Sequence, residues 1–463
     1  MHLVVLQHGV WGNPLNVKYL ANLVTEHLGN TGFVFNFSGN SKFATYDGID
    51  VCGERLFQGV KNTHDNLVHQ GTPPTHISFI GYSVGGLIAR YAAGRLFAEG
   101  YFDHVTPLNF ITIATPHLGS WRQPTSAIVR MMNVVTSAGL SRTGTQLCLR
   151  DITPWGAPLL CVLSHPGLNF MAALRGFKNI VAMANVRYDR LVTFCSAAMQ
   201  LEEPYPPRGF DRAVVLVNPA YTSIVRPRKP EDGPADPSLG RRPLRGRFPL
   251  VVLILLAIIL FPLVLLMPLL LLMHGWLHSR RPETTAADAV LQSLYTSWGG
   301  GASAAVGKQQ PSLQGPEVAQ GRPSAFDLES GLQLRAVASG SDGGYGRSGG
   351  LVTPNFVGAN AGARGGSEDR VPLHKDHLRQ HQLFEGLPPV TDKHHLQEWL
   401  EAQLATLPVR KVHVDTCNVF HAHSAIVVWN RLFLHCRDAM QYLVDQCMVW
   451  AAKDARQIQS QSD

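Results

Sequence analysis

The stretch HISFIGYSVGGLIAR, residues 76–90, decides the fold of this 463-residue chain. Its first part is an apolar run typical of a buried strand, and the part from Leu87 onward has the pattern of a helix. Between them, Gly81-Tyr82-Ser83-Val84-Gly85 fits the G-x-S-x-G turn, in which flanking glycines leave room for an exposed serine hydroxyl. We therefore predict that Ser83 is the nucleophile of a hydrolase. The alternative is an ordinary glycine turn between a strand and a helix.

A second match to the same five-residue pattern occurs around Ser348, in Gly346-Arg347-Ser348-Gly349-Gly350. It lies in glycine-rich sequence with no apolar run before it. An activated serine is positioned by a rigid strand that ends just before the turn, and of the two serines only Ser83 follows a strand-like run. The setting, rather than the five letters, therefore identifies Ser83.

The first apolar run, residues 3–6, has the pattern of a short strand and ends in Gln7-His8-Gly9-Val10-Trp11. In α/β-hydrolases the loop after such a strand supplies one backbone N–H to the oxyanion hole, and the residue after the nucleophile supplies the other. These donors would be Val10 and Val84. A plain turn at His8-Gly9 is the alternative.

The acid of a catalytic triad should follow a later strand. Residues 110–114 and 179–186 are apolar runs of strand type, and the second is followed by Asp189. Open α/β sheets place their sites at the carboxyl ends of strands, so Asp189 is our candidate acid. Asp151 and Asp211 have no comparable strand before them.

The base must lie after the long apolar run, because no histidine occurs between Asp189 and residue 273. Residues 411–414 resemble the last strand, and the loop after them carries His421 and His423. Either could be the base on the pattern alone. The order Ser, Asp, His predicts an α/β-hydrolase: a mostly parallel sheet with helices on both faces. A helix from Gln397 precedes this strand, and one C-terminal helix is expected to reach about Trp450.

Several blocks of the chain resemble the putative serine esterase family of lipase-like α/β-hydrolases, which has plant and algal members and is related to a fungal lipid-droplet phospholipase. They lie within residues 1–225 and 390–450 and read HLVVLQHGVWGNP, TYDGIDVCGERL, ISFIGYSVGGLIARYAAGRLF, FITIATPHLGS, LSRTGTQL, ANVRYDRLV and AHSAIVV. The resemblance implies Ser83 as nucleophile, Asp189 as acid and His423 as base. It also implies acyl ester hydrolysis on lipids. Many members have histidine where this chain has Tyr82.

Residues 248–273 contain no polar side chain. As one helix they would be about 39 Å long, which exceeds the roughly 30 Å hydrocarbon core of a bilayer. A single span would, however, separate Ser83 and Asp189 from His423, and proton transfer requires these groups within hydrogen-bond reach. Pro262 near the middle favours a break, so we predict a membrane hairpin, with a single span as the alternative. Arginines flank both ends, as expected if both face the cytosol.

The remaining sequence features concern organisation and environment. Seven scattered cysteines indicate reduced thiols, and a net charge of +7, partly beside the apolar run, favours an anionic lipid surface over nucleic acid. No cofactor or metal is expected, since His394-His395 lacks ligand spacing with a cysteine. We expect the following segments: the first part of the hydrolase core at 1–225, a basic proline-rich linker at 226–247, the hairpin at 248–273, a mostly disordered insertion at 274–389 and the last part of the core at 390–463.

Two classes of function fit this sequence. The first is a membrane-attached serine hydrolase of lipid esters on the cytosolic face of the endoplasmic reticulum or a lipid droplet; its substrate class could be a phospholipid, a lysophospholipid or an acylglycerol. The second is a catalytically silent membrane or lipid-droplet adaptor that keeps the fold. Residues suited to all three triad positions, together with an oxyanion loop, favour the hydrolase.

Overall fold

The computed structural model describes residues 1–206, 208–233, 269–278, 283–298, 384–417 and 420–451. The chain divides into two units, and the described residues all belong to the first, Met1–Ala302 with Leu378–Asp463. Ser348 and most of the expected insertion, like Pro262, lie outside the described residues.

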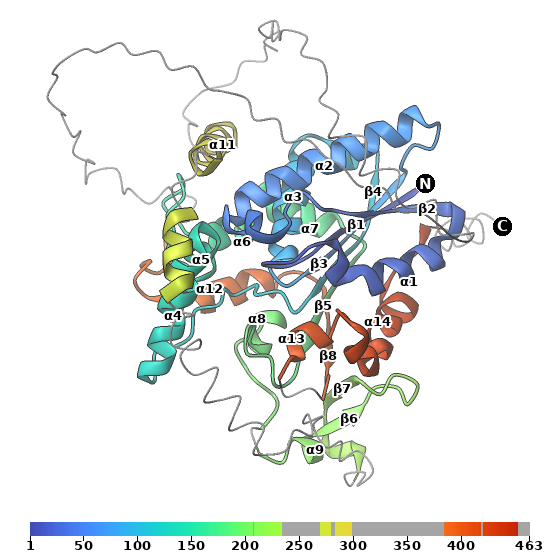
Figure 1. The fold of residues 1–463 in the computed structure, drawn as a ribbon, viewed down its shortest axis with the longest axis vertical. Helices are drawn as coiled ribbons and strands as arrows, with labels where there is room; N and C mark the ends of the chain where they lie inside the picture. Colours follow the sequence, from blue (N-terminus) through green and yellow to red (C-terminus); the bar gives the residue numbers. More distant parts are fainter. Residues whose placement is uncertain (207, 234–268, 279–282, 299–383, 418–419, 452–463) are drawn as a thin grey trace, which may run out of the picture. The chain divides into compact units, whose positions relative to one another are not determined.

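The core is an eight-stranded sheet in the order β2-β1-β3-β4-β5-β8-β7-β6 (Figure 1). Its pairings are parallel from β2 to β8 and antiparallel from β8 to β6. The mostly parallel sheet predicted from the sequence is thus present. The strands are β1 (His2–Gln7), β2 (Gly32–Asn36), β3 (His76–Tyr82), β4 (Thr106–Ile113), β5 (Asn179–Asn185), β6 (Val214–Leu216), β7 (Ile224–Pro227) and β8 (Val409–Val414).

Helices cover both faces of the sheet, which explains why the central strands are apolar on both sides. One hydrophobic cluster packs α2, α3, α6, α7, α11 and α12 against one face. A second packs α1, α13 and α14 against the other. The helices are α1 (Lys18–Leu28), α2 (Ile49–His69), α3 (Gly85–Ala98), α4 (Ala127–Gly139), α5 (Ser141–Leu147), α6 (Leu159–Ser164), α7 (Asn169–Gly176), α8 (Phe194–Ala197), α9 (Phe210–Ala213), residues 269–278, α11 (Glu283–Ser297), α12 (Lys393–Leu404), α13 (Ala422–Ala425) and α14 (Arg437–Tyr442).

The turn between β3 and α3 has the geometry that the sequence predicts. Ser83 has a φ of 55°, in the left-handed region that a non-glycine residue adopts only under strain. A Cβ atom on Gly81 would lie 2.4 Å from the Cα atom of Gly86, and one on Gly85 would lie 2.3 Å from the carbonyl oxygen of Gln7. The glycines are therefore required by close backbone approach on both sides of the serine.

The prediction of one C-terminal helix reaching Trp450 is wrong. The segment consists of α13, a 3₁₀ helix (Arg431–Cys436), α14 and a π-helical turn (Leu443–Cys447). Val428 has a φ of 53°, which a continuous α-helix cannot contain. The side chain of Asn430 then accepts a hydrogen bond from the backbone N–H of Leu432 and starts the next element. These breaks let the segment follow the face of the sheet on which α1 also packs.

Sheet structure extends into the start of the expected linker. Strand β7 continues through Pro227, a 3₁₀ turn (Pro230–Asp232) follows, and Arg226 pairs with Asp232 across it. Of the expected hairpin, residues 248–268 lie outside the described residues, and residues 269–273 begin the helix at 269–278. Within the described ranges, no helix combines the length and apolar character needed to cross a bilayer.

Candidate active site

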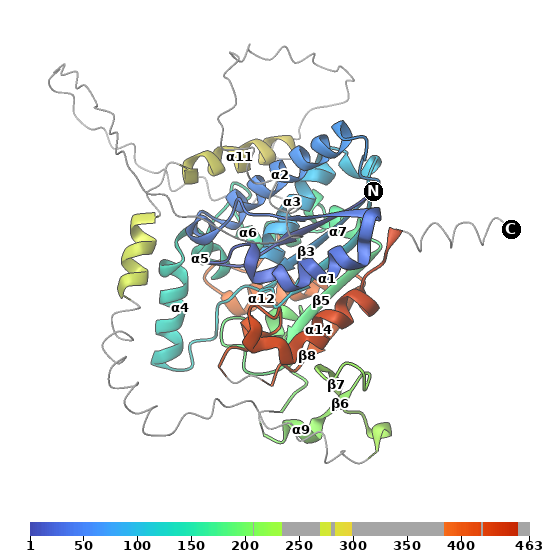
Figure 2. The same cartoon turned by 45° about the vertical axis from the view of Figure 1, so that its right-hand side comes forward.

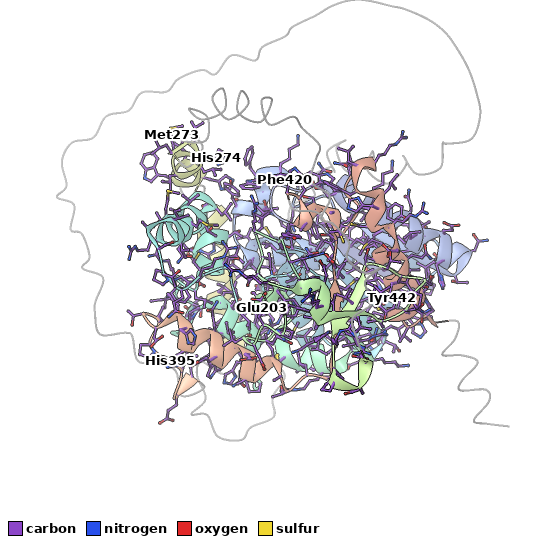
Figure 3. All side chains as sticks on the ribbon, turned by 90° about the horizontal axis from the view of Figure 1, so that it is seen from below. Glu203, Met273, His274, His395, Phe420 and Tyr442 are labelled. Atoms are coloured by element: carbon purple, nitrogen blue, oxygen red, sulfur yellow. The ribbon has the colours of Figure 1, made fainter. Side chains whose placement is uncertain are left out.

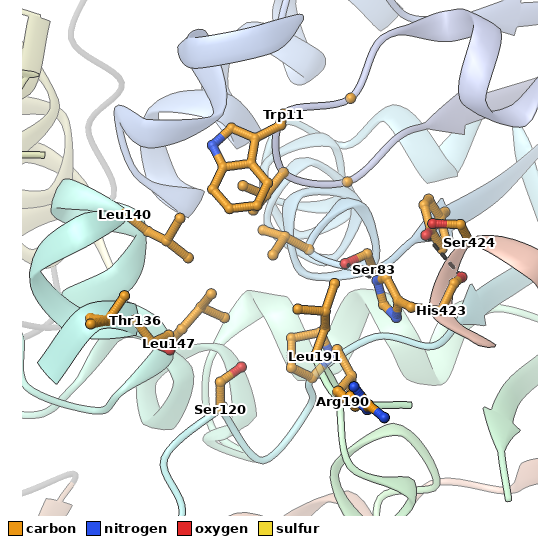
Figure 4. A pocket seen from close by; sticks show the side chains of 18 of the residues that line it. Trp11, Ser83, Ser120, Thr136, Leu140, Leu147, Arg190, Leu191, His423 and Ser424 are labelled. Atoms are coloured by element: carbon orange, nitrogen blue, oxygen red, sulfur yellow. Dashed lines mark hydrogen bonds between the residues drawn. The ribbon is translucent and has the colours of Figure 1, made fainter. Parts of the chain in front are cut away.

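The structure brings Ser83, His423 and Asp189 together at the carboxyl ends of β3, β5 and β8. Figure 4 shows Ser83 and His423 side by side. The Oγ atom of Ser83 lies 2.9 Å from Nε2 of His423. The Nδ1 atom of the same ring lies 2.8 Å from Oδ2 of Asp189. The three side chains therefore form a continuous hydrogen-bonded chain, although they are separated by up to 340 positions in the sequence.

This arrangement determines where the imidazole proton lies. The carboxylate of Asp189 can only accept, so Nδ1 of His423 carries the hydrogen and donates it. The Nε2 atom then has a free lone pair that accepts the hydroxyl hydrogen of Ser83. In this tautomer His423 is ready to remove a proton from the serine.

Asp189 is held in its charged form. Burial by itself would raise its pKa, but the attraction of His423 and the hydrogen bond from its ring outweigh this, and the pKa is lowered. Oδ1 accepts from the backbone N–H groups of Leu191 and Val192, both at 3.0 Å, and the amide of Asn185 donates to Oδ2 at 2.8 Å. With both oxygens occupied, the carboxylate has a fixed orientation toward the imidazole.

Two residues that sequence reasoning missed fix the backbone around His423. The hydroxyl of Tyr82 donates to the carbonyl oxygen of His423 at 2.9 Å, and its ring lies 5.1 Å from the imidazole. The amide of Asn185 donates to the carbonyl of Ala422 at 3.3 Å. Tyr82 directly precedes Ser83, so its hydrogen bond joins the segment that carries Ser83 to the segment that carries His423. Asn185, at the end of β5 and four residues before Asp189, could have been found by the same strand-end reasoning.

The alternative candidates for the base and the acid contact other residues. His421 is exposed at the start of α13, with its ring 6.0 Å from that of Phe433. Asp211 pairs with Arg187 at 3.4 Å. Asp151 accepts a hydrogen bond from the backbone N–H of Leu159 at 2.8 Å. Neither aspartate is the carboxylate that contacts His423.

Asp151 gives a prediction about stability, because burial raises its pKa from 3.8 to about 6. Its charged form is disfavoured in the folded state, so stability is lost as the pH rises from about 4 to 6 and stays reduced above that range. Asp151→Asn should therefore be more stable than wild type at pH 7.5, by at most about 3 kcal/mol, and should lose this advantage near pH 4. Urea unfolding at both pH values measures this; an equal difference at both would contradict it.

The predicted oxyanion donors flank the serine. Val10 lies in the loop after β1, and Val84 is the residue before α3. The loop approaches so closely that a Cβ atom on Gly9 would lie 2.6 Å from the Cβ of Ser83. Among the described residues, the backbone hydrogen bonds of turns, loops and helix caps include none donated by the N–H of Val10 or of Val84. Both valines line the cavity in front of Ser83, where the oxygen of a bound ester could lie.

Ser83 and His423 open into a cavity of about 290 Å³ (Figure 4). Its wall comes mainly from the loop after β1, from α4 and from the residues after Asp189. Helix α5 contributes Leu147, and the helix at 269–278 contributes Leu271. The polar lining includes Ser120, Arg122 and Arg190. The apolar lining residues are Val10, Trp11, Val84, Met132, Val135, Leu140, Leu147, Leu191, Val192, Leu271 and Trp429.

The aspartate-containing block of the resemblance, residues 47–56, stabilises the packing of helices and does not line the cavity. Asp50 pairs with Arg142 of α5 and accepts from the amide of Gln146 at 2.8 Å, and Arg142 also pairs with Asp288 of α11 at 2.7 Å. Asp47 pairs with Arg55. These buried carboxylates join α2, α5 and α11, and neither lines the cavity in front of Ser83.

Comparison with known proteins finds related sequences. Putative lipase C4A8.10 of Schizosaccharomyces pombe is 29% identical over 209 residues, which are 43% of this chain and 26% of that protein. Putative lipase ROG1 of Saccharomyces cerevisiae is 31% identical over 207 residues, which are 43% of this chain and 28% of that protein. The matched region thus spans between a quarter and a third of the length of these relatives.

Two solved structures show a weaker likeness. Phospholipase PlaB from Legionella pneumophila, in complex with thio-NAD, aligns with a TM-score of 0.28 and 13% identity over 41% of this chain and 38% of that one. The product of gene lin2722 from Listeria innocua aligns with a TM-score of 0.27 and 15% identity over 44% of this chain and 80% of that one. At these scores neither likeness supports a conclusion about this chain.

The family comparison covers the part of the chain that carries Ser83 and Asp189. Residues 1–200 match the model of the family described as putative serine esterase (DUF676). The match ends before His423, so the resemblance of residues 390–450 remains a prediction from the sequence. The first 200 residues of the chain are thus similar to the putative serine esterase family, the family that the resemblance named.

Proposed function

We propose that the protein is a serine hydrolase that cleaves acyl esters of lipids, with Ser83 as nucleophile, His423 as general base and Asp189 as the acid that orients it. The observation that carries this proposal is the hydrogen-bonded chain from Ser83 through His423 to Asp189, at 2.9 and 2.8 Å, facing an apolar cavity. A serine is a weak nucleophile unless an aligned base accepts its proton, and these contacts supply that base.

The reaction follows from these positions. The Oγ atom of Ser83 attacks the ester carbonyl carbon while its proton moves to Nε2 of His423. The carbonyl oxygen becomes negative and accepts from the N–H groups of Val10 and Val84. His423 then protonates the leaving alcohol, the carbon–oxygen bond breaks, and an acyl group remains on Ser83. A water molecule, deprotonated by His423, releases the fatty acid and restores the serine.

Lipid as the substrate class is supported by the wall of the cavity and by the surface beside it. The side of α4 that faces the cavity carries Met132 and Val135. The same helix also exposes Ile128, Met131 and Val134, with exposed fractions of 67%, 52% and 47%. A helix that is apolar on a solvent-facing side favours contact with another apolar phase.

The helix at 269–278 continues this apolar surface. It lies beside α4 in both views (Figures 1 and 2), and Gly275 is so close that a Cβ atom there would lie 2.1 Å from the carbonyl oxygen of Ala138. Met273 projects from this helix next to His274 (Figure 3). The exposed apolar residues on it are Leu269, Leu270, Met273, Trp276 and Leu277. We take this surface and the apolar run that leads into it as the attachment to a membrane or lipid droplet.

Removing apolar side chains from α4 should weaken attachment without affecting the chemistry. The double variant Ile128→Gln and Met131→Gln should bind phospholipid vesicles about tenfold or more weakly, because two exposed apolar side chains no longer enter the interface. Hydrolysis of a water-soluble short-chain ester should remain. Vesicle flotation measures binding, and Val68→Gln, which changes an exposed valine on α2, is the control. Unchanged flotation of the double variant would contradict the assigned surface.

The hairpin and the cytosolic orientation are tested by topology. We expect tags near Gly233 and Gly344 both to be cut by protease in cells with a permeabilised plasma membrane and intact internal membranes, since His423 must reach Ser83. Pro262→Leu favours a continuous helix and should move the Gly344 tag out of reach while activity falls. A protected Gly344 tag in active wild-type protein would exclude the hairpin.

The substrate is tested by profiling. Purified full-length protein should release fatty acid from at least one lipid among phospholipids, lysophospholipids and acylglycerols presented in neutral detergent micelles. The silent-adaptor alternative predicts release from none of them together with retained vesicle binding. That result would overturn the proposed activity.

A further inference from the structure

The apolar cavity in front of Ser83 contains two cationic side chains and no carboxylate. Arg122, between β4 and α4, and Arg190, directly after Asp189, both line it, and its lining includes neither aspartate nor glutamate. Arg190 and Leu191 line the same cavity as His423 (Figure 4). Two guanidinium groups beside low-dielectric walls give this part of the cavity a positive potential.

Arg122 is held firmly in place. Its backbone N–H donates to Oδ1 of Asn133 at 3.1 Å, and the amide of Asn133 donates back to its carbonyl at 2.6 Å. Its Nη2 atom donates to the carbonyl oxygen of Arg190 at 2.6 Å. The guanidinium is therefore fixed between α4 and the segment after Asp189, and a ligand would meet it already oriented.

The charge of Arg122 is incompletely compensated by the protein. Burial lowers the pKa of this arginine, although the charge of Asp189 opposes the effect. Asp189 itself is occupied by hydrogen bonds from His423, Asn185, Leu191 and Val192. Among the described residues, the Arg122 guanidinium donates to the backbone carbonyls of Arg190 and Leu191 and contacts the sulfur of Met132, and these partners are neutral. A partly buried cation with neutral partners gains most from an anionic ligand.

We propose that Arg122 and Arg190 form a subsite for the phosphate of the substrate, so that the ester cleaved at Ser83 is a phosphate-bearing acyl lipid. This inference rests on the proposed function and names its substrate class. A phosphate monoester carries about −1.5 to −2 charges and three acceptor oxygens, which match two guanidinium groups better than the single charge of a carboxylate does. The apolar wall from α4, α5 and the helix at 269–278 then receives the acyl chain.

The test compares two esters that differ only in phosphate: oleoyl glycerol and oleoyl lysophosphatidic acid, both in neutral detergent micelles. We expect wild type to have a kcat/KM at least about tenfold higher for the phosphate ester. Arg190→Gln and Arg122→Gln should each lower this preference by about tenfold, mainly through KM for the phosphate ester. An oleoyl ester of glyceric acid, which carries a carboxylate, should show a smaller preference than the phosphate ester.

The control is Arg208→Gln, which removes the same charge from an exposed arginine outside the cavity and should keep the wild-type preference. Arg190 is exposed, so its replacement is compatible with folding even if Arg122→Gln is not. Hydrolysis of both esters at equal kcat/KM, or an equal loss for both esters in the two variants, would overturn the subsite and leave the hydrolase. A preference for the carboxylate ester would also overturn it. Hydrolysis of neither, with no reaction at Ser83, would overturn the proposed function on which the subsite rests.

Discussion

Ser83→Ala is expected to remove nearly all ester hydrolysis, lowering kcat by about ten thousand-fold or more. The substitution removes only the hydroxyl group that would accept the acyl group. The remaining hydrogen bond between His423 and Asp189 cannot form an acyl-enzyme. Hydrolysis of a water-soluble ester by purified protein measures the effect. Ser348→Ala is the control, because it changes the second G-x-S-x-G serine and should leave activity unchanged.

The same position gives a stability test that separates chemistry from folding. Ser83 has a φ of 55°, which costs about 1 kcal/mol or more for a residue with a side chain. Ser83→Gly should therefore be inactive and yet unfold at a higher temperature than Ser83→Ala, since glycine adopts this conformation without strain. If both variants are inactive and Ser83→Gly melts at a higher temperature than Ser83→Ala, misfolding is excluded as the cause of the lost activity. Residual activity near that of wild type in Ser83→Ala would contradict the assignment.

His423→Ala is expected to lose nearly all activity, and His421→Ala should keep most of it. His423 contacts both Ser83 and Asp189, whereas His421 is exposed two residues earlier with its ring near Phe433. Members of a triad act as a unit, so removing the base costs about as much as removing the nucleophile. The two alanine variants change the same side chain on the same loop and are matched controls for each other. The reverse pattern would move the base to His421.

The sequence predicted the elements that lie along the sheet. Ser83 and Asp189 follow apolar runs long enough to identify as strands, and the ends of parallel strands meet at one edge. The pattern alone left His421 and His423 as alternatives, because two histidines on one loop differ only in how the loop turns. That difference appears in the structure, where Tyr82 and Asn185 bind the backbone on either side of the His423 ring.

Other features carried too little local signal. Strands β6 and β7 are three and four residues long, too short for an alternating pattern to distinguish them from loops. The break at Val428 lies in a run of apolar residues with no glycine or proline to mark it. Arg122 belongs to the site because it contacts both α4 and the segment after Asp189. The local pattern of apolar residues does not predict contacts between segments so far apart in the sequence.

The most direct test of the account is the site of covalent labelling by a fluorophosphonate, which reacts only with a serine activated by an aligned base. Wild-type protein should gain one adduct by intact mass, peptide mapping should place it on Ser83, and His423→Ala should slow labelling strongly. An adduct on another serine, or labelling of Ser83→Ala at the wild-type rate, would contradict the claim that Ser83, His423 and Asp189 form the catalytic triad.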